Sequence, residues 1–250
     1  MKIAISQPAY LPWCGFFDLI DQVDQFVFLD DAQFVKQSWH HRNRIKGTGA
    51  LQWLTVPVAY HGKLGQAISE VVIRDPQFAE KHTRSVEVNY GRSDYFEVYF
   101  PRFKAILQKY RSGGRLLDLN LDLIEWLVRE LMIATPSVRS SSLAAEGKRS
   151  SRLVSICKLL GATEYLSPRS ADYLRDDLPL FQEAGVALRF QNYTHPSYEQ
   201  RFPPFLAQAS VLDLLFNEGP AAGDILRSGR RTALEPSNLQ PCEAVAVAGV

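Results

Sequence analysis

The N-terminal part of the chain combines two kinds of hydrophobic pattern. Ile3–Ile5 and Phe26–Leu29 are apolar without interruption, which is typical of strands covered on both faces of a parallel sheet. Between them, the apolar residues from Phe16 to Val23 recur with helical spacing. Pro8 and Pro12 exclude a helix in the aromatic loop that precedes this segment. The pattern therefore predicts a strand, a loop, a helix and a second strand, in that order.

The same alternation returns after Pro136. Strands that are separated by short helices are usually joined by right-handed crossovers within one parallel sheet. The chain is therefore predicted to have an α/β fold, with a three-layer, Rossmann-like parallel sheet. The elements expected in this part are helices over Lys148–Leu160, Leu178–Ala184 and Ser210–Phe216 and strands over Thr163–Leu166 and Val186–Phe190.

The middle and the end of the chain depart from this alternation. Trp53–Val58 and Ile68–Ile73 read as strands and predict a β excursion outside the main sheet. Helical periodicity then predicts a mainly structural helical insertion over about residues 76–132, with helices up to Val88, over Tyr95–Tyr110 and over Leu116–Leu131. No periodicity follows Ser228. We expect a single domain over residues 1–227 and a flexible tail over residues 228–250.

Charge and cysteine content narrow the class of protein. The 250 residues include 28 Lys and Arg against 27 Asp and Glu, a balance that argues against a general nucleic-acid coat protein but allows a local basic patch. The 3 cysteines lack the spacing of a zinc site or a disulfide scaffold. No signal-like N-terminus and no long apolar run are present, so we expect a cytoplasmic protein without a membrane partner.

Polar side chains follow the first two predicted strands. In open α/β sheets, ligands bind outside the carboxyl ends of the strands. The adjacent carboxylates of Asp30 and Asp31 suit magnesium, a ribose hydroxyl or an amine. Alternatively, one aspartate caps a turn and the other is solvated. Gly15, at the start of the helix, either opens its N-terminus to an anion or simply lets the turn close. The other residues expected in this crevice are Gln7, Tyr10, Trp13, Asp30, Asp31 and Gln33.

The segment from Phe34 to Ile45 mixes aromatic rings with cations. Such a run is either a solvated basic face or a site that stacks on a ring and binds an anion, and the interleaved Trp and His residues favour the site. Cations would stabilise charge on a transferring phosphoryl or adenylyl group, and a histidine would act as a general base. The residues concerned are Lys36, Trp39, His40, His41, Arg42, Asn43 and Arg44.

A third polar group follows the later strands and is expected to form the opposite wall of the site. A histidine such as His195 is more often a structural hydrogen-bonding residue than a catalyst. The members of the group are Tyr165, Ser167, Arg169, His195, Tyr198 and Gln200. The chain has no GxSxG elbow, Walker A loop or GxGxxG fingerprint. This argues against serine hydrolases, P-loop kinases and classical dehydrogenases.

Four sequence blocks, QPAYLPWCGFFDLI, DQFVFLDDAQFVKQSWHHRNRI, RLVSICKLLGATEYLSP and HPSYEQ, resemble the WbqC-like protein family. The resemblance implies a role in O-antigen or specialised-metabolite biosynthesis, in which glycine or another acyl group is attached to a sugar. The chain departs from the family pattern at His41, where an asparagine is usual, and at Ser170 and Ala171, where paired glycines are common. Both departures suggest a different acceptor or acyl group.

A second, weaker likeness concerns the order of strand, Pro/aromatic loop and helix, which is similar to the beginning of pantothenate synthetase-type nucleotidylyltransferases. These enzymes form acyl adenylates. The loop of this chain has Tyr10 and Trp13 in place of their paired histidines. A shared order of elements raises the expectation of ATP chemistry without establishing it.

The chain is therefore predicted to be a transferase or ligase that attaches an acyl or aminoacyl group to an amine or hydroxyl of a sugar nucleotide or small metabolite, using ATP with Mg. Lys36, Arg42 and Arg44 would stabilise phosphate charge, and His41 would be the base. Asp30 or Asp31 would position a metal, a ribose or an amine. Two alternatives are aminoacyl transfer from a charged tRNA, which the near-neutral net charge disfavours, and a non-catalytic module that binds a nucleotide or sugar.

Overall fold

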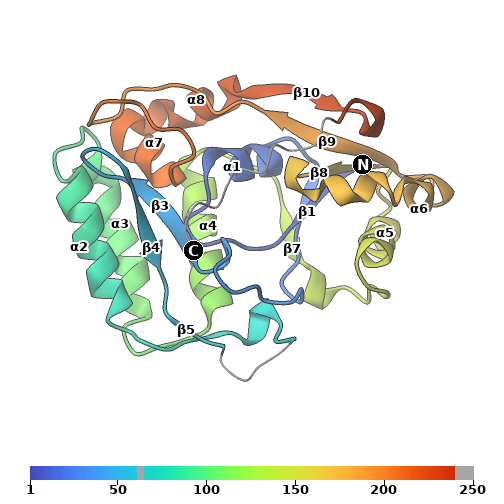
Figure 1. Ribbon diagram of the computed structural model, residues 1–250, viewed down its shortest axis with the longest axis horizontal. Coiled ribbons are helices and arrows are strands. Elements are labelled where there is room, and N and C mark those ends of the chain that lie inside the picture. Colours follow the sequence, from blue (N-terminus) through green and yellow to red (C-terminus); the bar gives the residue numbers. More distant parts are fainter. Residues whose placement is uncertain (61–64, 240–250) are drawn as a thin grey trace.

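A six-stranded sheet lies at the centre of a computed structural model of the chain, which describes residues 1–60 and 65–239 (Figure 1). The strands follow the order β10-β9-β8-β1-β2-β7, and all neighbours are parallel except β10, which is antiparallel to β9. This confirms the predicted Rossmann-like α/β fold. The strands are β1 (Lys2–Ser6), β2 (Gln25–Phe28), β7 (Ser137–Arg139), β8 (Glu164–Ser167), β9 (Ala187–Tyr193) and β10 (Arg230–Leu234).

Helices cover both faces of the sheet because its central strands alternate their side chains between two cores. Ile3, Ile5 and Val27 pack into a cluster with α5 (Ser150–Leu159) and α6 (Leu178–Glu183). Ala4 and Phe26 point the other way, into a larger cluster. The helices in this second layer are α1 (Cys14–Asp21), α4 (Leu116–Glu130), α7 (Val211–Glu218) and α8 (Ala222–Ser228).

The connection from β2 to its neighbour β7 contains both predicted excursions. It first forms the hairpin of β3 (Arg42–Lys46) and β4 (Leu51–Thr55), then the short pair β5 (Val58–Ala59) and β6 (Val72–Ile73). The helices α2 (Phe78–Tyr90), α3 (Phe96–Lys109) and α4 follow. Figure 1 shows α2, α3 and the hairpin together at one end of the molecule. The insertion therefore enlarges one end of the fold and leaves the sheet continuous.

The prediction of a strand over Ile68–Ile73 was wrong for its first half. Ile68–Glu70 forms a 3₁₀ turn, because the Glu70 carboxylate accepts a hydrogen bond from the Ala67 N–H at 3.1 Å. The Ile68 N–H donates to the Ala32 carbonyl at 2.9 Å, so this turn is attached to the loop after β2.

The prediction that the chain is a flexible tail from residue 228 onward was also wrong for the described residues. β10 closes one edge of the sheet, and the Arg230 guanidinium bonds to Asp18 at 2.9 Å and to Asp21 at 2.5 Å. Asp18 is completely buried, and burial raises its pKa despite the hydrogen bond from Arg230. The segment RRTAL lacks the apolar alternation that identifies a strand, which is why the pattern failed here. Residues 240–250 lie outside the described residues.

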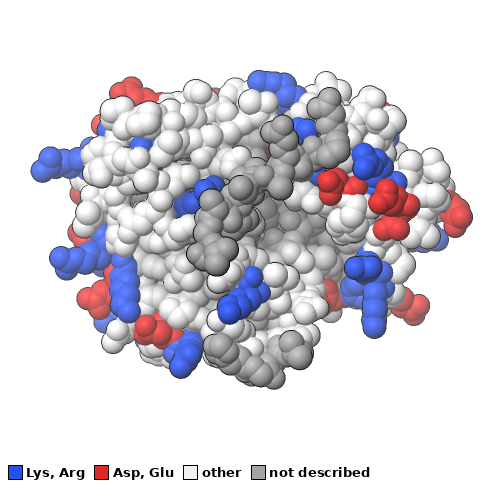
Figure 2. Space-filling view, viewed as in Figure 1, with Lys and Arg blue, Asp and Glu red and all other residues white. Residues whose placement is uncertain are grey.

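Acidic and basic side chains are interspersed around the rim of the face shown in Figure 2, in keeping with the net charge of +1. Among the helices of the described part of the chain, none is both long and apolar enough to cross a membrane.

We expect Arg230→Ala to lower the free energy of unfolding by about 2–4 kcal/mol, because it leaves the Asp18 carboxylate buried without its counter-charge. Denaturant unfolding of the purified protein measures the loss. The neighbouring Arg231 is exposed and bonds only to backbone carbonyls, so Arg231→Ala should change stability by less than about 0.5 kcal/mol. Equal effects of the two substitutions would contradict the assigned role.

Candidate functional site

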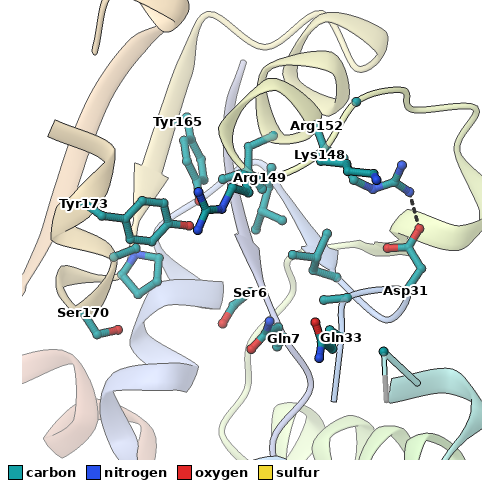
Figure 3. A pocket seen from close by; sticks show the side chains of 18 residues that line it. Ser6, Gln7, Asp31, Gln33, Lys148, Arg149, Arg152, Tyr165, Ser170 and Tyr173 are labelled. Atoms are coloured by element: carbon teal, nitrogen blue, oxygen red, sulfur yellow. Dashed lines mark hydrogen bonds and ion pairs between the residues drawn. The ribbon is translucent and has the colours of Figure 1, made fainter. Parts of the chain in front are cut away.

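A cavity of about 870 Å³ opens outside the carboxyl ends of β1, β2 and β8 (Figure 3). Its size is within the range of small-molecule sites. From β1 the chain continues to β2 on one side, whereas β8 lies on the other, so the cavity is at the point where the strand order reverses. The lining residues are Ile5, Ser6, Gln7, Leu29, Asp31, Ala32, Gln33, Gly65, Gly147, Lys148, Arg149, Arg152, Leu153, Tyr165, Pro168, Ser170, Ala171 and Tyr173.

One wall of the cavity is formed by the start of α5 and the loop before it. The sequence pattern did not predict that these residues belong to the site. Lys148, Arg149 and Arg152 line the cavity there. Gly147 has φ of +87°, and a Cβ at this position would lie 2.6 Å from the Ser151 Oγ, so the turn requires a glycine. The available signal was a glycine followed by cations at a helix start, which favours anion binding.

The cations on this wall differ in their partners. Arg152 donates to the Ala145 carbonyl at 2.6 Å and forms an ion pair with Asp31 across the cavity rim. Lys148 and Arg149 form no ion pair within residues 1–60 and 65–239. Figure 3 shows the Arg149 side chain directed toward the Tyr173 hydroxyl. The uncompensated positive charge of the wall therefore comes from Lys148 and Arg149.

Asp30 is completely buried behind the cavity and anchors the same loop. Its carboxylate accepts hydrogen bonds from the Arg139 guanidinium at 2.7 Å, from the Ser141 N–H at 2.9 Å and from the hydroxyls of Ser140 and Ser141. Burial acts to raise the pKa of Asp30, but the bonds from Ser141 and Arg139 outweigh it and hold the pKa below its usual value. Asp30 is thus a structural anchor for the loop.

Asp30 and Asp31 are also the residues expected to hold a magnesium ion. Asp31 accepts from the Ser140 hydroxyl at 2.6 Å in addition to its pair with Arg152, so both aspartates are engaged by protein groups. Within the described residues, no group of three or more His, Cys, Asp or Glu is arranged to hold a metal ion. The residues of this arrangement therefore do not fit a protein-held magnesium site.

The facing wall is neutral and carries two amides, Gln7 and Gln33, which both line the cavity (Figure 3). The Val35 N–H donates to Nδ1 of His40 at 3.4 Å, so His40 Nε2 carries the proton and donates to the Gln7 Oε1 at 2.8 Å. This leaves the amide N–H groups of Gln7 for a ligand. Burial, together with the neighbouring His41, lowers the pKa of His40 to about 4 and keeps the ring neutral.

The aromatic loop after β1 packs into the protein and does not line the cavity. Tyr10 is completely buried, and its hydroxyl bonds to Nδ1 of His82 at 2.8 Å. The Trp13 indole lies over Gly15, where a Cβ would come within 2.3 Å of Trp13 Cζ2. The structure gives a third reason for a glycine at position 15, close packing, because the Trp13 indole occupies the space that a side chain would take at the start of α1.

The basic segment lies on and beside the β3–β4 hairpin, and none of Lys36, Trp39, Arg42 or Arg44 lines the cavity. The amide of Asn43 is structural, because it donates to the Tyr10 and Leu11 carbonyls at 3.1 and 2.8 Å. This bond pair ties β3 to the aromatic loop.

His41 is buried, and its Nδ1–H donates to the Val56 carbonyl at 3.0 Å. Its ring packs against Phe34, with the two ring centroids 5.5 Å apart. The departure from the family pattern at His41 is therefore at a packing position. Its role as a base remains a prediction that this geometry does not favour.

The predicted site residues that follow β8 and β9 lie in two different parts of the structure. Tyr165 lines the cavity, and Ser167 is buried at the end of β8 beside the lining residue Pro168. Tyr198 and Gln200 instead donate to the buried Asp213 carboxylate, each at 2.7 Å.

His195 stacks on Trp13 with ring centroids 6.1 Å apart. The opposite wall of the cavity thus comes from the segment after β8. His195 packs on Tyr198, and Tyr198 and Gln200 bond to Asp213, in a separate, partly buried cluster.

Comparison with known proteins places this fold and cavity in a family. The model of the WbqC-like protein family matches residues 7–225. The chain belongs to the WbqC-like protein family. An uncharacterized protein of Mycobacterium tuberculosis (strain ATCC 25618 / H37Rv), Rv1507c, is 36% identical over 231 residues, which cover 92% of this chain and 99% of that protein. No solved structure matches the chain.

In this WbqC-like chain, the cavity belongs to the family region, because only Ile5 and Ser6 among the lining residues precede residue 7. Ser170 and Ala171, where the sequence resemblance leads us to expect paired glycines, lie in the cavity wall. The likeness to pantothenate synthetase is not supported by these comparisons and rests on the order of the first elements alone.

The His40 contact predicts a pH dependence of stability. His40 takes up a proton near pH 6.5 in the unfolded chain but only near pH 4 in the folded protein. The contribution of the neutral ring to the free energy of unfolding is therefore complete above about pH 6.5 and is lost as the pH falls to about 4. The loss should be about 2–3 kcal/mol. His40→Gln retains an N–H donor toward Gln7 and should flatten the unfolding free energy over this range.

Denaturant unfolding at a series of pH values checks this. His82, whose pKa burial also lowers to about 4, remains in the variant and should preserve part of the slope. An unchanged slope in His40→Gln would show that His40 does not titrate as described.

Proposed function

We propose that this WbqC-like protein is a transferase or ligase that attaches an acyl or aminoacyl group to an amine or hydroxyl of a phosphorylated small molecule, such as a sugar nucleotide. The observation that carries the proposal is the polarity of the cavity. Lys148 and Arg149 lie on one wall, whereas the neutral amides Gln7 and Gln33 lie on the other. A ligand with a phosphate end and a hydroxyl or amine end matches both walls.

The cationic wall supports the choice of a phosphorylated ligand. The N–H groups at the start of a helix favour an anion, and α5 points its start at the cavity. Charge-assisted hydrogen bonds from arginine and lysine to phosphate are stronger than those between neutral groups. Asp31 neutralises Arg152, so the charge available to a phosphate comes from Lys148 and Arg149.

The amide wall supports a sugar or amine at the other end. A glutamine amide donates and accepts hydrogen bonds, so it can bond to hydroxyl and amine groups alike. His40 holds the Gln7 carbonyl oxygen, so Gln7 is oriented before a ligand arrives. Preorganisation of this kind lowers the cost of binding.

The chemistry requires orientation of two reactants and stabilisation of charge on a leaving phosphate. Both effects are available from fixed hydrogen bonds and cations without a covalent enzyme intermediate. ATP would activate the carboxylate of the donor, as the sequence predicts: a carboxylate oxygen would bond to the α-phosphorus, and pyrophosphate would leave. The acceptor amine or hydroxyl would then bond to the acyl carbon, lose its proton to water and release AMP, while Lys148 and Arg149 hold the phosphate of the acceptor. The basic residues of the β3–β4 hairpin have no part in this arrangement.

A second candidate function is a non-catalytic module that binds the same ligand. It is favoured by the composition of the cavity wall. Among the described residues, the lining contains no His or Cys, and its carboxylate, Asp31, is paired with Arg152. A wall of this kind binds an anion without an evident general base.

The direct experiment is incubation of the protein with ATP, glycine or other carboxylates and a panel of nucleotide amino sugars, followed by assays for pyrophosphate release and product mass. A product supports the proposal. Binding of a nucleotide sugar by calorimetry without turnover across the panel would favour the non-catalytic module. A parallel arm with charged tRNA in place of ATP and free amino acid tests the tRNA-dependent alternative.

Lys148→Ala and Arg149→Ala should each weaken the binding of a nucleotide sugar about tenfold or more, because each removes a charge-assisted hydrogen bond. Isothermal titration calorimetry measures the change. Lys158→Ala is the matched control, since Lys158 is an exposed cation of α5 outside the cavity. This variant should bind the nucleotide sugar as tightly as the native protein does. Native-like affinity in both cavity variants would remove the proposed phosphate site.

The double substitution Ser170→Gly and Ala171→Gly should change ligand choice more than stability. It introduces the glycines that the sequence resemblance implies for the family, and it removes side-chain atoms from the cavity wall. Bulkier acyl groups or acceptors should then compete better, which is measured as a shift in relative affinity across the panel. A thermal melt controls for folding, and an unaltered order of preference would exclude these positions from specificity.

A further inference from the structure

Two large indoles lie exposed side by side on the β3–β4 hairpin and the segment before it. Trp39 is 44% exposed and Trp53 is 39% exposed, and their ring centroids are 5.4 Å apart at an interplanar angle of 31°. Exposed apolar surface of this kind usually marks an interaction site. Exposed aromatic rings beside cationic side chains in particular are the surfaces on which unpaired nucleic-acid bases stack.

Two arginines accompany the indoles. Arg42 and Arg44 alternate with Asn43 on β3 and therefore share one face of the strand. The Arg42 guanidinium lies 4.4 Å from the centre of the Trp53 ring, and that of Arg44 lies 5.5 Å from Trp39 and 5.4 Å from Trp53. We call Trp39, Arg42, Arg44 and Trp53 the Trp-Arg platform.

The platform has no counter-charge within the described residues. Neither arginine forms an ion pair there, and the buried Nε atoms of both lack a hydrogen-bond partner. Arg139, Arg152 and Arg230 are paired with aspartates instead. The sequence contains no Asp or Glu between Asp31 and Glu70, although the chain as a whole is balanced. The uncompensated charge calls for an anionic partner.

The platform is separate from the cavity, since none of its residues lines it. Small ligands usually bind in concave sites, whereas a single strand of nucleic acid follows an open surface of aromatic and cationic side chains. We infer that the Trp-Arg platform binds an unpaired nucleic-acid strand, with bases stacked on the indoles and phosphates bonded to the arginines. The unpaired end of a charged tRNA would fit this surface, so the platform gives the tRNA-dependent alternative a structural basis.

The test is fluorescence anisotropy of a labelled short single-stranded RNA with the full chain at low salt. The native protein should bind it, bind a duplex of the same sequence more weakly, and lose affinity as salt rises. Trp39→Ala and Trp53→Ala should weaken binding about tenfold or more, and Trp53→Phe should retain most of it, because a ring remains for stacking. Arg44→Gln should weaken binding and reduce the slope of affinity against salt by about one.

Lys104→Ala is the matched control. Lys104 lies 6.0 Å from the Phe100 ring on α3, outside the platform, so its loss removes one cation and one cation–π contact and should leave RNA binding as in the native protein. Thermal melts confirm that each variant is folded. No binding by the native protein at low salt, or native-like binding by folded Trp53→Ala, would overturn the inference and leave the platform as hairpin packing. The assay contains no small-molecule ligand, so its outcome is independent of the cavity.

Discussion

The hydrogen bonds to the Asp30 carboxylate are the constraint on which the candidate site depends. A buried charge is costly unless it is paired and fully hydrogen-bonded, and Asp30 meets this requirement only if the segment after β7 closes onto it. Arg139, Ser140 and Ser141 supply the donors. Their closure brings the following loop, with Lys148 and Arg149, to the carboxyl ends of the central strands. The cationic wall of the cavity is thus positioned by an interaction behind it.

Pairing also decides which cations remain for a ligand. Asp31 joins Arg152 and holds α5 against the loop after β2, so this guanidinium contributes structure more than free charge. On the other wall, burial keeps His40 neutral, and a neutral ring orients the Gln7 amide without adding charge. One wall is therefore positive and the other neutral, because each ionisable group behind the walls is either paired or uncharged.

The long connection between β2 and β7 gives the molecule a second set of unpaired cations. The central sheet supplies the cavity, whereas this connection supplies His40, which supports the cavity, and the Trp-Arg platform, which lies apart from it. The separation explains why residues that are close in sequence divide between two surfaces. Gln33 lines the cavity, yet Arg42 begins a strand that pairs in a different sheet.

Hydrophobic periodicity by itself determined the four central strands of the parallel sheet, the main helices and the helical insertion, because the burial of one face or both imposes a repeat that is local in sequence. It also placed Gln7, Asp31 and Gln33 at the cavity, since polar residues that end parallel strands meet at one edge. It missed both edge strands of the sheet, β10 and β7, whose sequences RRTAL and SVR have no such repeat. Only the tertiary structure decided the partners of the charged groups. Arg139 lies 109 positions from Asp30 and Arg152 lies 121 positions from Asp31, and no local pattern encodes pairs that form only when the chain has folded.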